Sequence, residues 1–246
     1  MKRSNLDAKT RARLVKAFGQ PSRVSKMPGA CSPSLPPTSC GAGSRLRHVE
    51  GTPCHDCYAE RLRKAYPSAA KRWTQNVRTL RRALQTPEGR SAWVAAGAVL
   101  LWDESERFES NRVRWHVAGD IQSPDHLEMI AQVCRLTPKL RHRLPTQESA
   151  MLAFATRRGF QAPPNLKITV SLPRQDAKAP APSPAFPYAT SNVWTRDHLE
   201  EHKPAGLEHK PAGFVCPAVL NHTPCLDCAA CWPGPQSRQH VIYPKH

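Results

Sequence analysis

The sequence predicts an α/β protein in which parallel βαβ units form a partial, TIM-like barrel, with Cys-rich irregular segments at both ends. Three observations support this fold class. Residues 112–119, 140–145 and 166–172 have the character of strands, helical spacing fills the intervals between them, and the loops that join them are short. Strands joined through helices pair in parallel by right-handed crossovers, and such units curl into a closed or partly closed barrel.

Four helices are expected before the first strand. The first is a basic helix at residues 6–18, and the next two cover residues 58–66 and 69–84. The fourth begins at Pro87, with Thr86 as its N-cap, and extends to about residue 102.

Two more helices are expected between the strands. Ser123 is a suitable N-cap for the first, with Pro124 at the first helical position. Thr146 is a suitable N-cap for the second, which is predicted to reach Arg158 and to end at Gly159.

Composition divides the chain into four parts. They are a basic N-terminal helix or arm (1–22), an α/β domain (23–175), a Pro-rich linker (176–213) and a Cys-rich segment that packs on the main domain (214–246). Residues 24–53 are rich in Pro, Gly and Ser, and such a long irregular segment suggests that a metal holds it. The linker contains a tandem repeat, residues 201–207 and 208–214, which we interpret as a tolerated loop expansion without chemistry.

The charge is uneven along the 246 residues, whose net charge is +17. Residues 1–90 contain 19 Lys and Arg against 5 Asp and Glu, a net of +14. This imbalance predicts that residues 1–90 bind nucleic acid, and the alternative is a solvating surface on a basic protein. Since no motif for reading bases is present, such binding would depend on the phosphate backbone. Protein partners are not predicted.

No apolar run approaches the roughly eighteen residues that span a bilayer, so no membrane association is expected. The basic N-terminus has no apolar segment after it, which indicates that the protein is not secreted and is cytoplasmic. In a reducing compartment nine cysteines are unlikely to form a disulfide framework, and metal or cluster ligation becomes the leading hypothesis.

Eight of the nine cysteines form two sets with similar spacing. The first set is Cys31, Cys40, Cys54 and Cys57, and the second is Cys216, Cys225, Cys228 and Cys231. Each set begins with Cys-x8-Cys, and each contains Thr-Pro-Cys-x-Asp-Cys. Two residues between cysteines allow both thiolates to reach one metal. We therefore predict all eight as ligands. Cys134, on the apolar face of a helix, is predicted to be a small core residue.

The spacing favours an iron–sulfur cluster, most often of the 4Fe-4S type, over zinc. The run Cys225-x2-Cys228-x2-Cys231, with the more distant Cys216, is typical of ferredoxin-like ligation. Zinc remains the alternative, because two sets of four cysteines also match two tetrahedral sites. Either both sets hold a cofactor, or one is structural.

A candidate site for ligands lies at the carboxyl ends of the predicted strands. Asp120 follows the first strand and is predicted as a polar contact or general base, with a helix-capping or loop role as the alternative. His116 is predicted to be a core histidine with its polar atoms satisfied rather than a ligand.

The chain resembles the gene product 88 family of actinobacterial phages. The likeness is carried by Lys26-Met27-Pro28-Gly29, Cys54-His55-Asp56-Cys57-Tyr58-Ala59, Trp115-His116-Val117-Ala118-Gly119-Asp120, Leu144-Pro145-Thr146-Gln147-Glu148 and Cys225-x2-Cys228-x2-Cys231-Trp232. The resemblance implies a phage-encoded, cluster-bearing protein of the host cytoplasm with an incomplete barrel. The chain is also distantly similar to radical-SAM-type barrels, but it lacks their Cys-x3-Cys-x2-Cys signature. The predicted function is thus an iron–sulfur protein of unknown substrate, and the alternative is a zinc- or cluster-stapled nucleic-acid-binding protein. Neither prediction specifies whether the protein is an enzyme.

Overall fold

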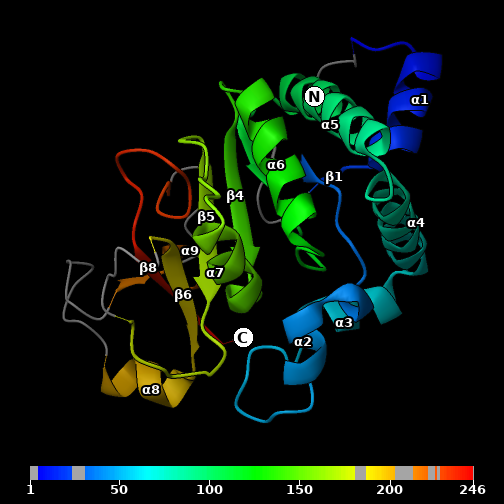
Figure 1. The fold of residues 1–246 in the computed structure, drawn as a ribbon. Coiled ribbons are helices and arrows are strands. Elements are labelled where there is room, and N and C mark those ends of the chain that lie inside the picture. The colour runs from blue at the N-terminus through cyan, green and yellow to red at the C-terminus, as the bar shows by residue number, and fades with distance from the viewer. Residues whose placement is uncertain are drawn as a thin grey trace.

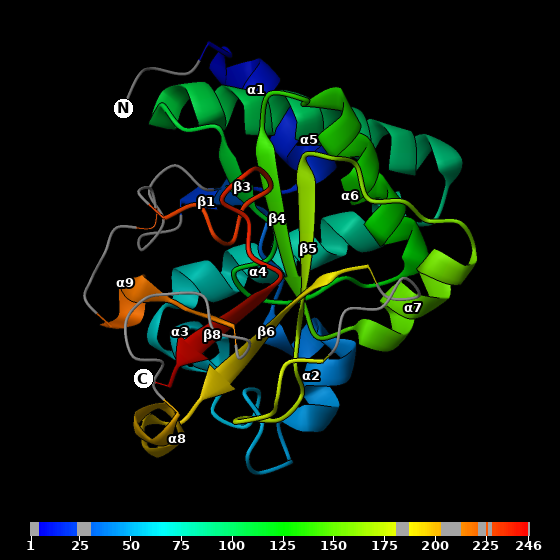
Figure 2. The same cartoon turned by 90° about the vertical axis from the view of Figure 1, so that its left-hand side faces the viewer.

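A curled sheet of six parallel strands is backed on one face by long helices (Figures 1 and 2). The computed structural model describes residues 5–23, 31–180, 187–202, 213–220, 225 and 228–245. The strands follow the order β3-β4-β5-β6-β8-β7, and every neighbouring pair is parallel. The predicted fold class, a partial barrel of parallel βαβ units, is confirmed.

The sheet consists of β3 (Arg112–Arg114), β4 (Arg141–Thr146), β5 (Leu166–Ser171), β6 (Ala189–Trp194), β7 (Phe214–Val215) and β8 (His240–Pro244). The short strands β1 (Ser22–Arg23) and β2 (Cys31–Ser32) form a separate antiparallel pair. The helices are α1 (Ala8–Phe18), η1 (Pro37–Ser39), α2 (Gly41–Leu46), α3 (Tyr58–Ala65), α4 (Pro67–Ala83), α5 (Pro87–Phe108), α6 (Pro124–Leu136), α7 (Ser149–Arg157), α8 (Arg196–Glu201) and α9 (Pro217–Leu220). No helix among the described residues is long and apolar enough to cross a membrane.

Helix α5 is longer than expected. Its start is as predicted, because the Thr86 side chain accepts a hydrogen bond from the Gly89 amide and Pro87 takes the first position. It continues past residue 102 to Phe108, where Glu109 adopts a left-handed conformation with φ 53°. The additional turn carries Asp103 and Glu104, which are buried although they are acidic.

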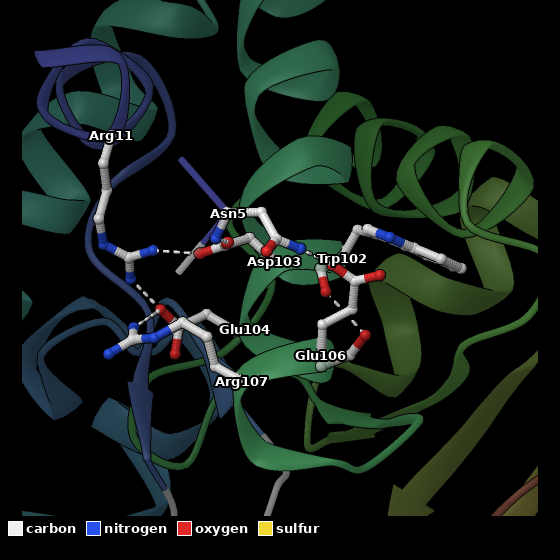
Figure 3. Close-up of polar contacts among 8 residues, drawn as sticks. Asn5, Arg11, Trp102, Asp103, Glu104, Glu106 and Arg107 are labelled. Atoms are coloured by element: carbon white, nitrogen blue, oxygen red, sulfur yellow. Dashed lines mark hydrogen bonds and ion pairs between the residues drawn. The ribbon is translucent and has the colours of Figure 1, made fainter. Parts of the chain in front are cut away.

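Helix α1 is attached to this acidic turn (Figure 3). The Arg11 guanidinium donates to Asp103 Oδ2 at 2.5 Å and also to Glu104, which Arg107 contacts at 2.7 Å. The centroid of the buried Phe18 ring lies 4.5 Å from the centroid of the Trp93 ring. The basic N-terminal helix therefore packs onto the core, and its contacts are both ionic and apolar.

The expected strand at residues 112–119 ends early, at Arg114. His116 has φ 55° and Gly119 has φ 81°, and these left-handed positions turn the chain. Glycine is required at 119, since a Cβ there would lie 2.5 Å from Leu35 Cβ. The backbone thus leaves the sheet after three residues and places Asp120 at the carboxyl end of β3.

Two segments that were expected to be irregular contain regular structure. Residues 24–53 include the short helix α2, and the predicted linker of residues 176–213 contains β6, which lies inside the sheet between β5 and β8. The tail contributes β8, which also was not predicted. In the tandem repeat, residues 203–212 lie outside the described residues.

Candidate metal centre

The face of the sheet opposite the helices is lined by cations. Arg112 pairs with Arg141, and Arg114 pairs with Arg143. Arg143 in turn pairs with Lys167, so all five side chains project to the same face. Barrel interiors are usually filled by branched apolar residues, which makes a layer of positive charge here unusual.

The C-terminal segment of residues 228–238, together with Cys225, covers this cationic layer, and Figure 2 shows the segment in front of the sheet. Three of the cations donate hydrogen bonds to its backbone carbonyls. These bonds are Arg112 to Cys225 at 2.6 Å, Arg141 Nε to Pro233 at 2.8 Å, and Lys167 to Ala230 at 2.7 Å and Arg238 at 2.6 Å. The segment is thus held by charge-assisted bonds that leave its side chains available.

Cysteines of the second set influence one another electrostatically at this place. Burial raises the pKa of Cys225, and the neighbouring Cys231 and Cys228 raise it further. Burial alone would lower the pKa of Arg143, but Cys231, Tyr243 and Cys216 together raise it. Cys231, Cys216 and Cys225 of the second predicted set therefore act on one buried guanidinium, and Cys228 acts on Cys225, but no three of these sulfurs among the described residues lie within 4.8 Å of one another.

Tyr243 connects this guanidinium to a thiol. Arg143 Nη2 donates to the Tyr243 hydroxyl oxygen at 2.5 Å, and that oxygen lies 3.0 Å from Cys231 Sγ. Burial raises the pKa of Tyr243, so the hydroxyl keeps its proton. Because Arg143 has no acceptor atom, we infer that the Tyr243 O–H donates to the sulfur. Such a donor stabilises the negative charge of a thiolate.

The first cysteine set lies at the carboxyl ends of β3 and β4. Cys40 precedes α2, Cys57 precedes α3, and Cys54 lies in the turn between these helices. A Cβ on Gly43 would be 3.6 Å from Cys54 Sγ and 3.7 Å from Cys40 Sγ, so a glycine lets α2 approach both sulfurs. For Cys31 the structure describes the backbone in β2 and not the side chain.

The surroundings of the first set are acidic. Burial raises the pKa of Cys54 to about 11, and Cys57 and Asp120 contribute in the same direction. Burial also raises the pKa of Cys40, followed by the effect of Asp120. Glu148 accepts a hydrogen bond from the Ala42 amide at 2.6 Å, at the start of α2. Arg47 lowers the pKa of Cys54, so this set has both carboxyl groups and a guanidinium near it, whereas the pKa of Cys225 in the second set responds to burial, to other cysteines and to two guanidinium groups.

Asp120, the predicted general base, is buried and held by three donors. Its carboxylate accepts from Thr146 Oγ1 at 2.6 Å, from the Gln147 amide at 2.8 Å and from the Ile121 amide at 2.8 Å. Burial raises its pKa to about 7 despite these hydrogen bonds. The carboxyl thus has the pKa of a base near neutral pH, and its three contacts also fix the loop, so the structure is compatible with both predicted roles.

Thr146 does not cap α7, so the expected N-cap is wrong. The helix begins at Ser149 with Glu148 in the cap position, and that residue makes no side-chain capping bond. The Thr146 hydroxyl instead donates to Asp120 and accepts from the Glu148 amide at 3.0 Å. The buried Asp120 carboxylate therefore competes with the helix for the Thr146 hydroxyl, and the sequence spacing does not reveal that the two residues are close.

The loop after β3 lies between the two cysteine sets. Val117 packs with Trp232, Cys225 and Cys231, while the next residue, Ala118, packs in a cluster that includes Cys57. Cys134 is fully buried in the core, as predicted, and so is His116.

Sequence reasoning missed the side chains that surround the cysteines, above all Arg143, Lys167, Tyr243 and Glu148. A signal was present: Arg112-Val113-Arg114 and Arg141-His142-Arg143 place a charge at every second strand position. In a buried parallel strand such alternation indicates that one face meets something other than an apolar layer.

Comparison with known protein families gives a match that covers most of the chain. The sequence model of a family described as Gene product 88 matches residues 4–234. No curated protein and no solved structure matches the chain.

Proposed function

Because the chain belongs to the Gene product 88 family, a name that states no activity, we propose its function from the candidate site. We propose that it is a phage-type iron–sulfur protein whose concave sheet face holds a cluster through Cys216, Cys225, Cys228 and Cys231. The observation that carries this proposal is the meeting of these cysteines with the cationic layer of the sheet.

The residues present suit such a cluster. Four thiolates bring more negative charge than the cluster core offsets, so the bound group is an anion. In this proposal Arg143 and Lys167 lie beneath the cluster. Burial lowers the pKa of Lys167 to about 8, and Cys231 acts in the opposite direction. Burying positive charge is unfavourable unless negative charge is near. The Tyr243 hydroxyl at 3.0 Å from Cys231 adds a hydrogen bond to sulfur.

We propose a second metal centre at Cys40, Cys54 and Cys57. Here Asp120 and Glu148 take the place of the cations, and both raise the pKa of Cys54. An anionic cluster is less favourable beside two carboxyl groups, whereas a dication such as zinc compensates them. Cys31, the fourth residue of this set, is proposed as a further ligand on its spacing alone.

Metal analysis of two cysteine variants tests both assignments. The protein and each variant are purified anaerobically, and iron, acid-labile sulfide and zinc are measured per chain. Cys228→Ser/Cys231→Ser is expected to lose iron and sulfide, and Cys40→Ser/Cys54→Ser is expected to lose zinc and retain iron. Cys134→Ala, a buried cysteine outside both sets, is the matched control. Stoichiometric zinc without iron in all of these proteins contradicts the proposal.

A second candidate function, nucleic-acid binding, is favoured by the charge of two neighbouring helices. Helices α1 and α4 pack against each other and together carry nine Lys and Arg and no Asp or Glu. The exposed members on α4 include Arg78, Arg81 and Arg82. Positive charge concentrated on two neighbouring helices attracts a phosphate backbone, although Arg11 is paired with Asp103 and Glu104.

Fluorescence anisotropy with single- and double-stranded oligonucleotides tests this function. We expect affinity to fall steeply as salt rises and to fall at least tenfold in Arg78→Ala/Arg81→Ala/Arg82→Ala. Lys139→Ala/Arg157→Ala/Arg158→Ala, which also removes three exposed positive charges and lies outside α1 and α4, is the control for total charge. Equal loss in both variants, or binding insensitive to salt, contradicts a specific surface on α4.

A further inference from the structure

A group of three metal-ligating side chains lies outside both cysteine sets. His198, Glu201 and His202 each place one ligand atom within 4.8 Å of the others. Their spacing of three and four residues puts them on one side of α8. A different side of the helix is anchored by Leu199, which is buried.

The first turn of α8 fixes the position of His198. Thr195 caps the helix, and its hydroxyl accepts a hydrogen bond from the His198 amide at 3.3 Å. The Thr195 hydroxyl itself donates to Asp176 Oδ2 at 2.9 Å. The buried Trp194 ring meets the His198 ring edge-on at 4.7 Å between centroids. The His198 imidazole is thus held by Trp194 at the end of β6 and by the Thr195 cap.

The second imidazole is oriented by the backbone. His202 Nδ1 lies 3.1 Å from the His198 carbonyl oxygen, and because a carbonyl only accepts, Nδ1 carries the proton. The other ring nitrogen, Nε2, then has its lone pair available. A ligating histidine in a metal site typically donates its second ring N–H to a carbonyl or carboxylate in this way.

We propose that His198, Glu201 and His202 bind a divalent transition-metal ion of the zinc type. Two imidazoles and one carboxylate form a borderline donor set that favours zinc, nickel, copper or cobalt over magnesium and calcium. Three protein ligands leave a tetrahedral ion with one position for water or another molecule. The site is independent of the cysteine-bound cofactors.

The position of this site on the fold suggests a ligand-binding role for that open position. Helix α8 follows β6 at its carboxyl end, the end at which α2 also lies (Figure 1). The Trp194 carbonyl accepts from the Lys245 amide at 2.7 Å, and Lys245 Nζ lies 3.4 Å from Asp56, between Cys54 and Cys57. The metal site therefore shares an edge with the first cysteine set, and this edge is where parallel barrels bind ligands.

Cobalt(II) titration of the full-length protein tests the proposal. Sulfur ligation produces intense charge-transfer bands in the near ultraviolet, whereas nitrogen and oxygen ligation produces only weak visible bands, so the two kinds of site are read separately. The double variant His198→Asn/His202→Asn is compared with His48→Asn, an exposed histidine outside the group. Equilibrium dialysis with zinc counts the ions bound per chain.

We expect the wild type and His48→Asn to bind one more ion per chain than the double variant, with unchanged sulfur bands in all three. Glu201→Gln, at an exposed position, is expected to weaken that ion at least tenfold without changing the circular dichroism spectrum. Equal ion counts and equal affinities in the wild type and in Glu201→Gln would overturn the proposal, whether or not the double variant folds. If the wild type shows the additional ion but no sulfur charge-transfer bands, the result argues against the cysteine centres and still supports the histidine site.

Discussion

Replacement of Tyr243 by Phe tests the contact between the sheet and the second cysteine set. The substitution keeps the ring and removes the hydroxyl that lies 3.0 Å from Cys231 Sγ and 2.5 Å from Arg143 Nη2. If the hydroxyl donates to a ligating thiolate, its loss destabilises the more negatively charged state of the centre. We therefore expect the reduction potential to become more negative.

The size of the shift follows from the strength of such a bond. A hydrogen bond to a charged group contributes about 1.5–3 kcal/mol, and about half of this is expected to differ between the two oxidation states. A difference of about 1 kcal/mol corresponds to about 40 mV for a one-electron couple.

Spectroelectrochemical titration under anaerobic conditions measures this shift. Tyr188→Phe is the matched control, since the Tyr188 hydroxyl contacts Thr156 at 2.5 Å and lies outside the cysteine set. We expect a negative shift of about 20–60 mV in Tyr243→Phe and a shift within about 10 mV in the control. A positive shift, or equal shifts in both variants, refutes the inferred O–H donation to sulfur.

The remaining predictions concern stability and are measured by urea unfolding. Burial lowers the pKa of His142 to about 3 from 6.5, so the unfolded chain takes up the proton first as pH falls. The contribution of His142 to the free energy of unfolding is therefore fully present above pH 6.5, and about 2 kcal/mol of it is lost by pH 5. We expect a smaller loss in His142→Asn. A slope that is equal in the variant contradicts this account. Arg11→Met removes the guanidinium that pairs with the buried Asp103 and Glu104, of which Glu104 keeps its contact with Arg107, and is expected to lower the free energy of unfolding by about 2–3 kcal/mol, whereas the exposed Arg13→Met changes it by less than about 0.5 kcal/mol. Gly119→Ala combines a positive φ with a clash and is expected to destabilise the protein by about 2–4 kcal/mol. Gly51→Ala, where φ is positive but the space is open, is expected to cost about 1 kcal/mol. Equal effects of the two substitutions would show that the close approach at Gly119 is unimportant.

The sheet core could be predicted from sequence because its strands and helices have local signals. Pro124 after Ser123, and Pro87 after Thr86, mark helix starts that the structure reproduces, and the apolar residues of β5 mark a buried strand. These signals depend on a few adjacent residues and need no tertiary contact.

The other half of the sheet could not be predicted in the same way. Strand β6 reads Ala189-Thr-Ser-Asn-Val-Trp194 and follows a Pro-rich stretch, so its polar residues suggested a linker. In the structure Asn192 is buried, and its side chain donates to the Ala177 carbonyl while its oxygen accepts from the Val193 amide at 2.7 Å. Polar residues become compatible with a central strand only through such contacts, which a sequence pattern does not show.

The candidate site shows the same division. Cysteine spacing divides the ligand candidates into two predicted sets, because Cys-x2-Cys is a local constraint, and the division stays a prediction. The charges that distinguish the sets come from distant parts of the chain: Arg143 and Tyr243 beside Cys231, and Asp120 beside Cys40. Only the fold reveals that one set faces cations and the other faces carboxylates.

X-ray absorption at the iron and zinc edges of the Cys54→Ser/Cys57→Ser variant tests the central claim most directly, because in this variant the cysteine set on the concave face of the sheet is the one that remains complete. We predict iron with sulfur neighbours and a second shell of iron from a cluster. An iron-free protein, or zinc surrounded by sulfur at about 2.3 Å in these cysteines, would contradict the assignment of a cluster to the cationic face.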